Sequence, residues 1–125
     1  MNNKELGTAF ERLVVDSLKR QGYWVHFMTP DSRGAQPFDI IAVKNGMARA
    51  IECKTLAKSM NYFCITRLED NQISAFELWE KCGNGTPIIY VYHRGRIVSI
   101  DYDELKAHGK VRMPNENDST KPNNS

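Results

Sequence analysis

Two carboxylates and an amine are the residues of this chain most suited to chemistry. Asp39 follows Phe38 and precedes Ile40-Ile41, and the tripeptide Glu52-Cys53-Lys54 begins thirteen residues later. The two apolar runs are joined by Asn45-Gly46, a dipeptide typical of a tight hairpin turn. If residues 38–44 and 47–54 pair as strands across this turn, Asp39 and Glu52 lie near the same end of adjacent strands.

Alternation along a strand then places Glu52 and Lys54 on one face and Cys53 on the other. Each charged residue has an ordinary structural interpretation as well. Asp39 can cap the end of a strand, and Glu52 and Lys54 can form an ion pair on an exposed sheet face. Together, however, they make an acidic and basic cluster on apolar strands, which costs stability unless a ligand satisfies it.

A divalent metal with a phosphate ester is the ligand that these residue types favour. Asp39 and Glu52 supply hard oxygen ligands, and the carbonyl of Cys53 adds a backbone oxygen. Such a metal activates water and polarises a phosphodiester, while Lys54 orients the nucleophile or offsets transition-state charge. Glu11, at the edge of an expected helical stripe, completes the shell, although a single helical glutamate is usually a surface residue.

The pattern of apolar residues predicts the elements that must position this cluster. A helix is expected over 3–21 with a stripe that includes Leu13, then a strand over 23–29, a loop over 30–37 and the hairpin over 38–54. Residues 62–66 fit either a short strand or an extended connection. A second helix is expected from Asp70 or Asn71 to about Cys82, with core residues Ile73, Phe76, Leu78 and Trp79. Strands over 87–93 and 96–100 and a short helix over 103–108 complete one domain over 1–112, followed by a disordered polar tail over 113–125.

Composition excludes several classes of protein. With 125 residues, 41% hydrophobic content and a formal net charge of +2, the chain is not a strongly basic nucleic-acid binder, so any DNA contact requires local patches or an oligomer. It has no apolar run of the ~20 residues that a membrane span needs. The polar start predicts no secretory or transit signal, and three cysteines without CxxC spacing predict neither a zinc site nor a disulfide framework. We therefore expect a cytoplasmic protein in a reducing compartment.

The order Glu11, Asp39 and Glu52-x-Lys54 resembles the PD-(D/E)XK nuclease superfamily, and most closely the archaeal-type and phage Holliday junction resolvases. The start Gly7-x-x-x-Glu11, the lead Gly22-Tyr23-Trp24-Val25 and the loop Ser32-Arg33-Gly34 also fit, over roughly residues 7–92. The family's Pro-Asp appears as Pro37-Phe38-Asp39, with one residue inserted. The resemblance implies an α/β fold with a restriction-endonuclease-like core, a central mixed β-sheet flanked by helices. It also implies a homodimer that cuts four-way DNA junctions with Mg²⁺, or with Mn²⁺ in its place.

The resemblance adds three substrate-side residues to the catalytic set. Ser32 and Arg33 would lie in a loop near the scissile phosphate, and Gln72 would lie near the site from the second helix, although Gln72 also fits a solvated helix face. Two other functions remain open. One is a restriction-like or repair endonuclease or exonuclease on linear or flapped DNA. The other is a DNA-binding module of the same fold without catalysis.

Overall fold

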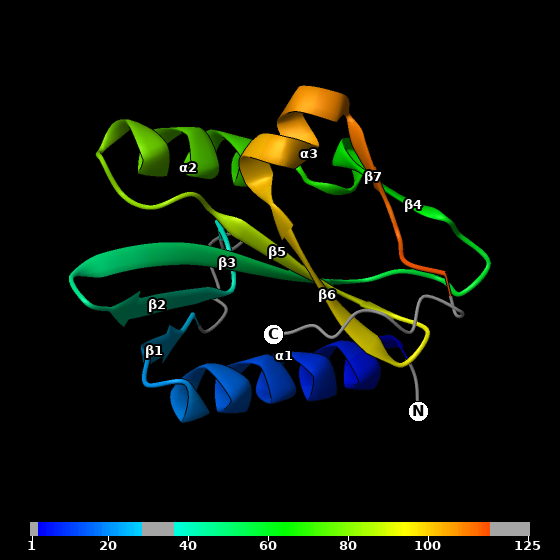
Figure 1. Cartoon of the computed structure of the whole chain (residues 1–125), viewed down its shortest axis with the longest axis horizontal. Helices are drawn as coiled ribbons and strands as arrows, with labels where there is room; N and C mark the ends of the chain where they lie inside the picture. Colours follow the sequence, from blue (N-terminus) through cyan, green and yellow to red (C-terminus); the bar gives the residue numbers. More distant parts are fainter. Residues whose placement is uncertain (1–2, 29–36, 116–125) are drawn as a thin grey trace.

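The computed structural model describes residues 3–28 and 37–115, with the side chains of residues 3 and 4 left out. These residues form three α-helices, one short 3-10 helix and seven strands (Figure 1). Their bounds are α1 Asn3–Arg20, β1 Trp24–Phe27, β2 Ile40–Lys44, β3 Met47–Thr55, β4 Tyr62–Cys64, η1 Ile65–Arg67, α2 Asp70–Lys81, β5 Ile88–His93, β6 Arg96–Asp101, α3 Tyr102–His108 and β7 Lys110–Arg112.

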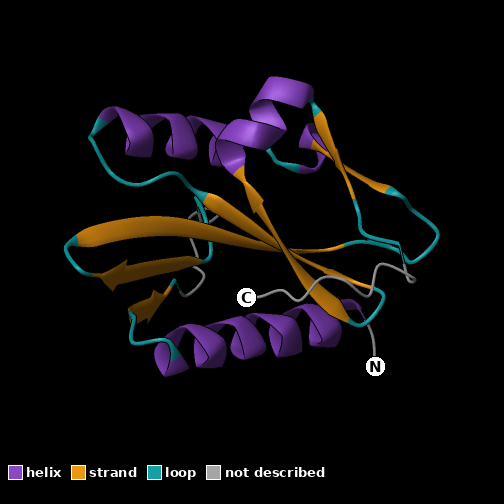
Figure 2. Ribbon diagram, viewed as in Figure 1, coloured by secondary structure: helices purple, strands orange, loops and turns teal. Residues whose placement is uncertain are grey.

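A five-stranded mixed sheet in the order β1-β2-β3-β5-β6 forms the centre of the described fold. Only the central pair, β3 and β5, is parallel, and α2 lies in the connection between them. The pairs β1–β2, β2–β3 and β5–β6 are antiparallel. A separate two-stranded ribbon pairs β4 with β7. Helix α1 covers one face of the sheet, and α2 with α3 covers the other (Figure 2).

Alternating side chains of the sheet divide into two hydrophobic cores, one on each face. Ile51 and Cys53 of β3 join α1 residues Phe10, Val14 and Leu18. Ala50 faces the other way, into the larger core that contains Phe76 of α2. The nine residues of β3 therefore contact both layers, which makes this strand a rigid support for side chains near its carboxyl end.

The predicted hairpins form at the two expected turns. Asn45 and Gly46 have φ values of 55° and 78°, and Arg94 and Gly95 have 53° and 75°. Positive φ at both central residues is the type I′ pattern, whose twist matches that of the paired strands. The first of these turns sets the register in which Ile40 faces Ile51.

Three details of the expected helices were wrong. Leu13 and Leu78 are 53% and 62% exposed, because each lies about 100° or more around its helix from the buried residues Val14 and Phe76. The second helix begins at Asp70, and its N-cap is Glu69 instead of Asp70 or Asn71. The cap belongs to a reciprocal Glu69–Gln72 capping box.

The expected boundary at residue 113 also needs correction. Met113 is 3% exposed and packs in the larger core, and its N–H donates to the carbonyl of Asn61 at 2.8 Å. The strand β7 just before it was not predicted, because three residues contain too few alternating positions to give a signal. The folded part thus reaches at least Asn115, and the rest of the expected tail lies outside the described residues. Within the described segments, no helix is long and apolar enough to cross a bilayer.

Candidate active site

The β2–β3 register brings Asp39 and Glu52 together. Asp39 precedes β2 and pairs with the end of β3, where its N–H donates to the carbonyl of Ile51 at 3.0 Å. Its carboxylate oxygen Oδ2 accepts a hydrogen bond from the N–H of Cys53 at 2.8 Å. The backbone of β3 therefore fixes the Asp39 side chain beside Glu52, as the hairpin pattern predicted.

Glu52 is the most constrained of the charged residues, with only 4% of its surface exposed. Its Oε2 accepts a hydrogen bond from Nε2 of Gln72 at 2.9 Å and lies 3.4 Å from Nζ of Lys54. Its Oε1 is buried and has no hydrogen-bond partner among the described residues. A buried carboxylate oxygen without a partner costs stability, so this atom is available to a proton or to a cation.

Gln72 is buried at the start of α2, so the interpretation of a solvated helix residue was wrong. Its Oε1 accepts the N–H of Glu69 at 3.0 Å, and its Nε2 donates to Glu52. One side-chain amide thus caps the helix and holds the glutamate. The cap was not recognised from the sequence because Glu69 is a less common N-cap residue than the Asp and Asn that follow it.

Burial governs the electrostatics of the cluster. Burial and, after it, the charge of the Asp39 carboxylate raise the pKa of Glu52 from 4.5 to about 8, while Lys54 acts in the opposite direction. Burial also raises the pKa of Asp39, against the lowering effects of the Cys53 N–H and Lys54. On α1, burial and then the charge of Asp39 raise the pKa of Glu11 to about 7. The three carboxyl groups therefore keep their protons to higher pH than the same groups do when they are exposed to water.

The Cys53 side chain lies on the opposite face of β3, as the alternation predicted. Burial raises the pKa of its thiol, and the nearby Asp39, Glu11 and Glu52 carboxylates raise it further. The thiol is thus held neutral and is a poor metal ligand or nucleophile. Cys53 therefore contributes to the site through its backbone, whose N–H holds the Asp39 carboxylate.

A divalent cation fits the donors present. Asp39 and Glu52 offer adjacent carboxylates, and the orphaned Oε1 of Glu52 is a hard oxygen of the kind that Mg²⁺ prefers. Within residues 3–28 and 37–115, no group of three or more His, Cys, Asp or Glu residues is placed to hold a metal by side chains alone. Glu11 is therefore near Asp39 electrostatically but does not form a ready-made three-residue cage with Asp39 and Glu52.

Two expected residues, Ser32 and Arg33, lie outside the described residues. Of the described basic residues, Arg67 lies beside the site, where its Nη2 donates to the carbonyl of Thr55 at 2.8 Å. In the sequence it is one of many scattered cations, and nothing in its local pattern distinguishes it. The structure therefore joins Glu11, Asp39, Glu52, Lys54 and Gln72 in one region and adds Arg67 at its edge.

Comparisons with known proteins bear on the fold and the family of this chain. The crystal structure described as Hjc from Archaeoglobus fulgidus, a Holliday junction resolvase from an archaeal hyperthermophile, matches with a TM-score of 0.54 and 18% identity. The match covers 81% of this chain and 93% of that chain, and it confirms the expected mixed sheet flanked by helices. Among curated protein sequences there is no match. The family model for archaeal Holliday junction resolvase (Hjc) matches residues 2–121, and the chain therefore belongs to this family of PD-(D/E)XK-like nucleases.

Proposed function

We propose that this chain is a divalent-metal-dependent endonuclease that resolves four-way DNA junctions by phosphodiester hydrolysis, with Mg²⁺ as its metal and with two chains acting as a homodimer. The observation that carries the metal dependence is Glu52, a buried carboxylate with one oxygen that has no partner among the described residues. Family membership supports the junction as substrate.

Asp39, Glu52 and the carbonyl of Cys53 would hold the cation. When bound, the cation would polarise the phosphodiester and make an attacking water more acidic. The chain's own residues prepare the site for it. The Cys53 N–H holds Asp39 in place, and Gln72 holds Glu52. This fixed arrangement limits the reorganisation needed when charge develops in the transition state.

Lys54 is assigned to orienting the nucleophilic water or to stabilising the negative charge that develops on the phosphorane. Its Nζ lies 3.4 Å from Glu52 and its side chain is 17% exposed, so it is anchored at one end and reachable from solvent. Glu11, half-buried on α1 with a pKa of about 7, is assigned to water at the site, where it can accept or release a proton near neutral pH. Ser32 and Arg33 remain proposals for the phosphate contact.

A homodimer suits the substrate, because resolution of a junction needs paired cuts on opposing strands and a twofold protein matches a near-twofold junction. The described part of the chain carries one such cluster, so two copies would supply two cuts. Light scattering of the purified protein, alone and with a junction, tests this stoichiometry directly.

Cleavage of a labelled four-way junction, beside a linear duplex and a flap of the same sequence, tests the proposal. Reactions would contain Mg²⁺, Mn²⁺ or a chelator, and Asp39→Asn would control for contaminating nucleases. We expect paired symmetric nicks in the junction, with Mg²⁺ or Mn²⁺ and not with chelator. Equal cutting of linear DNA would replace junction resolution with a general nuclease function, and metal-independent cutting would remove the assignment of Asp39 and Glu52.

A further inference from the structure

Six cations gather at one end of this molecule, although the formal net charge of the chain is only +2. Three segments, 56–68, 93–100 and 109–115, each contain two Lys or Arg residues and no Asp or Glu. We call these six residues the cationic end: Lys58, Arg67, Arg94, Arg96, Lys110 and Arg112. The segregation leaves this end positive under conditions in which the whole chain is nearly neutral.

Hydrogen bonds fix the three segments against one another. Arg94 donates from Nε to the carbonyl of Lys58 at 2.9 Å and from Nη2 to Oδ1 of Asn61 at 3.4 Å. The buried His93 ring contacts the carbonyl of Met60 through Nε2 at 2.9 Å. Arg96 donates from Nη1 to the carbonyl of Asn115 at 3.4 Å. The spacing of these cations is therefore set by the fold and does not depend on mobile loops.

The β4–β7 ribbon presents two of the cations on an aromatic support. Tyr62 pairs with Arg112 in the ladder, and Lys110 lies two residues away on the same face. The Nζ of Lys110 lies 4.4 Å from the centroid of the Tyr62 ring, and the guanidinium carbon of Arg112 lies 5.6 Å from it. Phe63 and Val111 face the core from the other side. The ring thus holds two exposed cations in defined positions.

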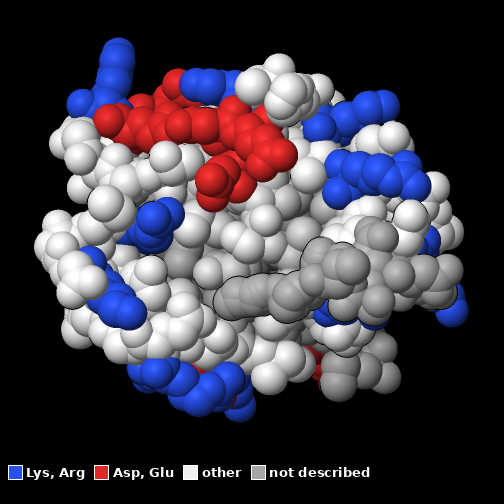
Figure 3. All heavy atoms as spheres, viewed as in Figure 1, with Lys and Arg blue, Asp and Glu red and all other residues white. Residues whose placement is uncertain are grey.

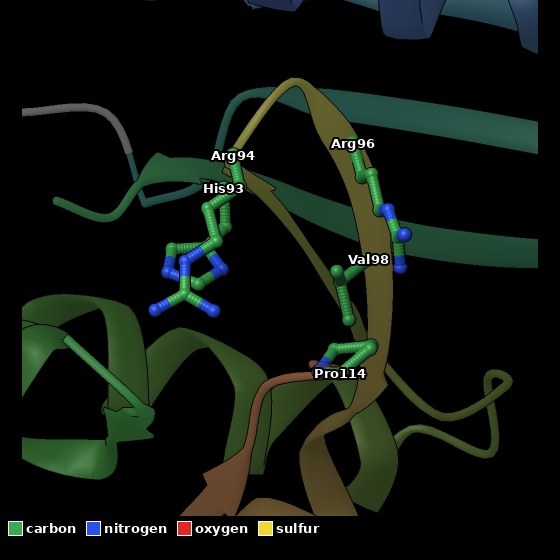
Figure 4. A pocket seen from close by; sticks show the side chains of 5 residues that line it. All are labelled: His93, Arg94, Arg96, Val98 and Pro114. Carbon is green, nitrogen blue, oxygen red and sulfur yellow. The ribbon is translucent and has the colours of Figure 1, made fainter. Parts of the chain in front are cut away.

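A small pocket adjoins this ribbon and is lined by His93, Arg94, Arg96, Val98 and Pro114. Figure 4 shows Arg94 and Arg96 on opposite sides of the β5–β6 turn, with Val98 and Pro114 between the strands below. The two guanidinium groups point to opposite sides of the turn, so this part of the cationic end presents separate positive charges and no closed phosphate cavity.

An acidic face adjoins the cationic end. Glu77, Glu80, Asp103 and Glu104 lie on α2 and α3. In Figure 3 the red atoms gather over these helices, while blue atoms lie over the side where β4 and β7 are found in Figure 1. A polyanion approaching the protein is thus repelled by the face over α2 and α3 and attracted to the cationic end beside it.

The cationic end begins where the candidate active site ends. Lys58 follows Lys54 by four residues, a distance of at most about 14 Å along an extended chain. Arg67 donates to the carbonyl of Thr55, the last residue of β3. A phosphate backbone that reaches Lys54 therefore needs only a few further nucleotides to reach these cations.

From these observations we infer that the cationic end is a second DNA-contact surface, which binds the phosphate backbone of one duplex arm of the junction beyond the point of cleavage. The inference rests on the proposed function for the identity of the DNA. It adds a residue-level assignment, with Lys110 and Arg112 held by Tyr62 as the central contacts. The contact is made to phosphates, so it carries no sequence preference.

Binding of a fluorescent four-way junction in chelator, followed by anisotropy over a series of salt concentrations, tests the inference without any need for cleavage. The test variant is Lys110→Gln/Arg112→Gln, which keeps the side-chain stems against Tyr62 and removes both charges. The control is Lys19→Gln/Arg20→Gln, which removes the same charge from the last turn of α1. Thermal melting of each variant checks that it remains folded.

We expect the test variant to lower the slope of log affinity against log salt by about 2 and to weaken binding on the order of 10- to 100-fold at low salt, because each lost phosphate contact removes roughly 0.9 from the slope. The control should stay near wild type. Replacing the arm phosphates beyond the cleavage point with neutral methylphosphonate linkages should make the test variant and wild type alike.

Each other outcome overturns a defined part of the reasoning. If wild type binds and cuts the junction but the test variant equals the control, the inference is wrong and the proposed function stands. If the loss persists when the arm phosphates are neutral, the cations contact the branch and not an arm, which also overturns it. If wild type neither binds nor cuts a junction, the proposed function itself is wrong. A Tyr62→Ala variant that weakens binding, with Tyr62→Phe restoring it, would support the positioning role of the ring.

Discussion

Substitution of Glu52 by Gln should stabilise the metal-free protein at neutral and alkaline pH. The folded-state pKa of about 8, against 4.5 for the exposed group, means that the folded protein holds a proton that the unfolded chain releases between these values. Because the folded state binds more protons there, the free energy of unfolding falls as pH rises from 4.5 to 8. The stability contributed by protonated Glu52 is fully present below pH 4.5, and it is lost as the pH rises through about 8.

The size of the effect follows from the same two values. At about 1.4 kcal/mol per pH unit, the interval from 4.5 to about 8 gives an upper limit of about 5 kcal/mol, and roughly 3 kcal/mol at pH 7. Glutamine keeps one oxygen that can accept from Gln72 and Lys54. It also leaves an unpartnered amide at the position of Oε1, so the measured gain should be smaller than this limit.

The assay is urea unfolding in chelator at several pH values between 5 and 8.5, for wild type, Glu52→Gln and the exposed control Glu104→Gln. Glu11 and Asp39 add to the pH dependence of all three proteins, so the difference between wild type and Glu52→Gln reports Glu52 together with its coupling to Asp39. Added Mg²⁺ should stabilise wild type and not Glu52→Gln, because only wild type retains the ligand. Equal free energies of unfolding for wild type and Glu52→Gln at pH 8 would refute the reasoning that burial of the ionised Glu52 carboxylate destabilises the folded protein.

Other substitutions test the remaining roles. Asp39→Asn should lower junction cleavage by at least about 100-fold, the scale for one lost electrostatic contact in the transition state, while junction binding in chelator is retained; lost binding would indicate misfolding. Lys54→Ala should lower cleavage on the same scale yet keep the Mg²⁺-induced rise in melting temperature, and loss of that rise would make Lys54 part of the metal site. Phe76→Ala should cost about 3–5 kcal/mol in urea unfolding, because the ring is 0% exposed and packs 5.1 Å from Tyr102 between centroids; a loss below about 1 kcal/mol would contradict this packing.

The site was more predictable than the surface around it. Glu52 and Lys54 lie on β3, and Asp39 lies just before β2. The turn that joins these strands needs positive φ at both of its central residues, so the register could be predicted from the sequence. Leu78 shows the opposite case. Its apolar type suggested burial, but burial of a helical residue depends on which face meets the sheet, and α2 carries too few apolar residues to define that face locally.

Long-range contacts account for the rest of what was missed. The strand β7 exists because it pairs with β4, about fifty residues earlier, and neither strand alone has enough residues to predict it. The cationic end has the same origin. Its three segments are unremarkable in sequence and become one surface only when Arg94 and the ribbon join them. Likewise, Arg67 acquired its place beside the site from the fold.

Gln72 has a consequence for how this position can vary among related chains. Both ends of its side-chain amide form hydrogen bonds. The oxygen accepts from the N–H of Glu69 at the start of α2, and the nitrogen donates to Glu52. Asparagine is one methylene shorter, glutamate would set an oxygen against an oxygen, and leucine would satisfy neither end. The side-chain NH₂ resonances of this residue should therefore exchange slowly with solvent and shift when Glu52 gains or loses a proton or a ligand. A single isotopically labelled glutamine would then act as an internal reporter of the state of the catalytic carboxylate.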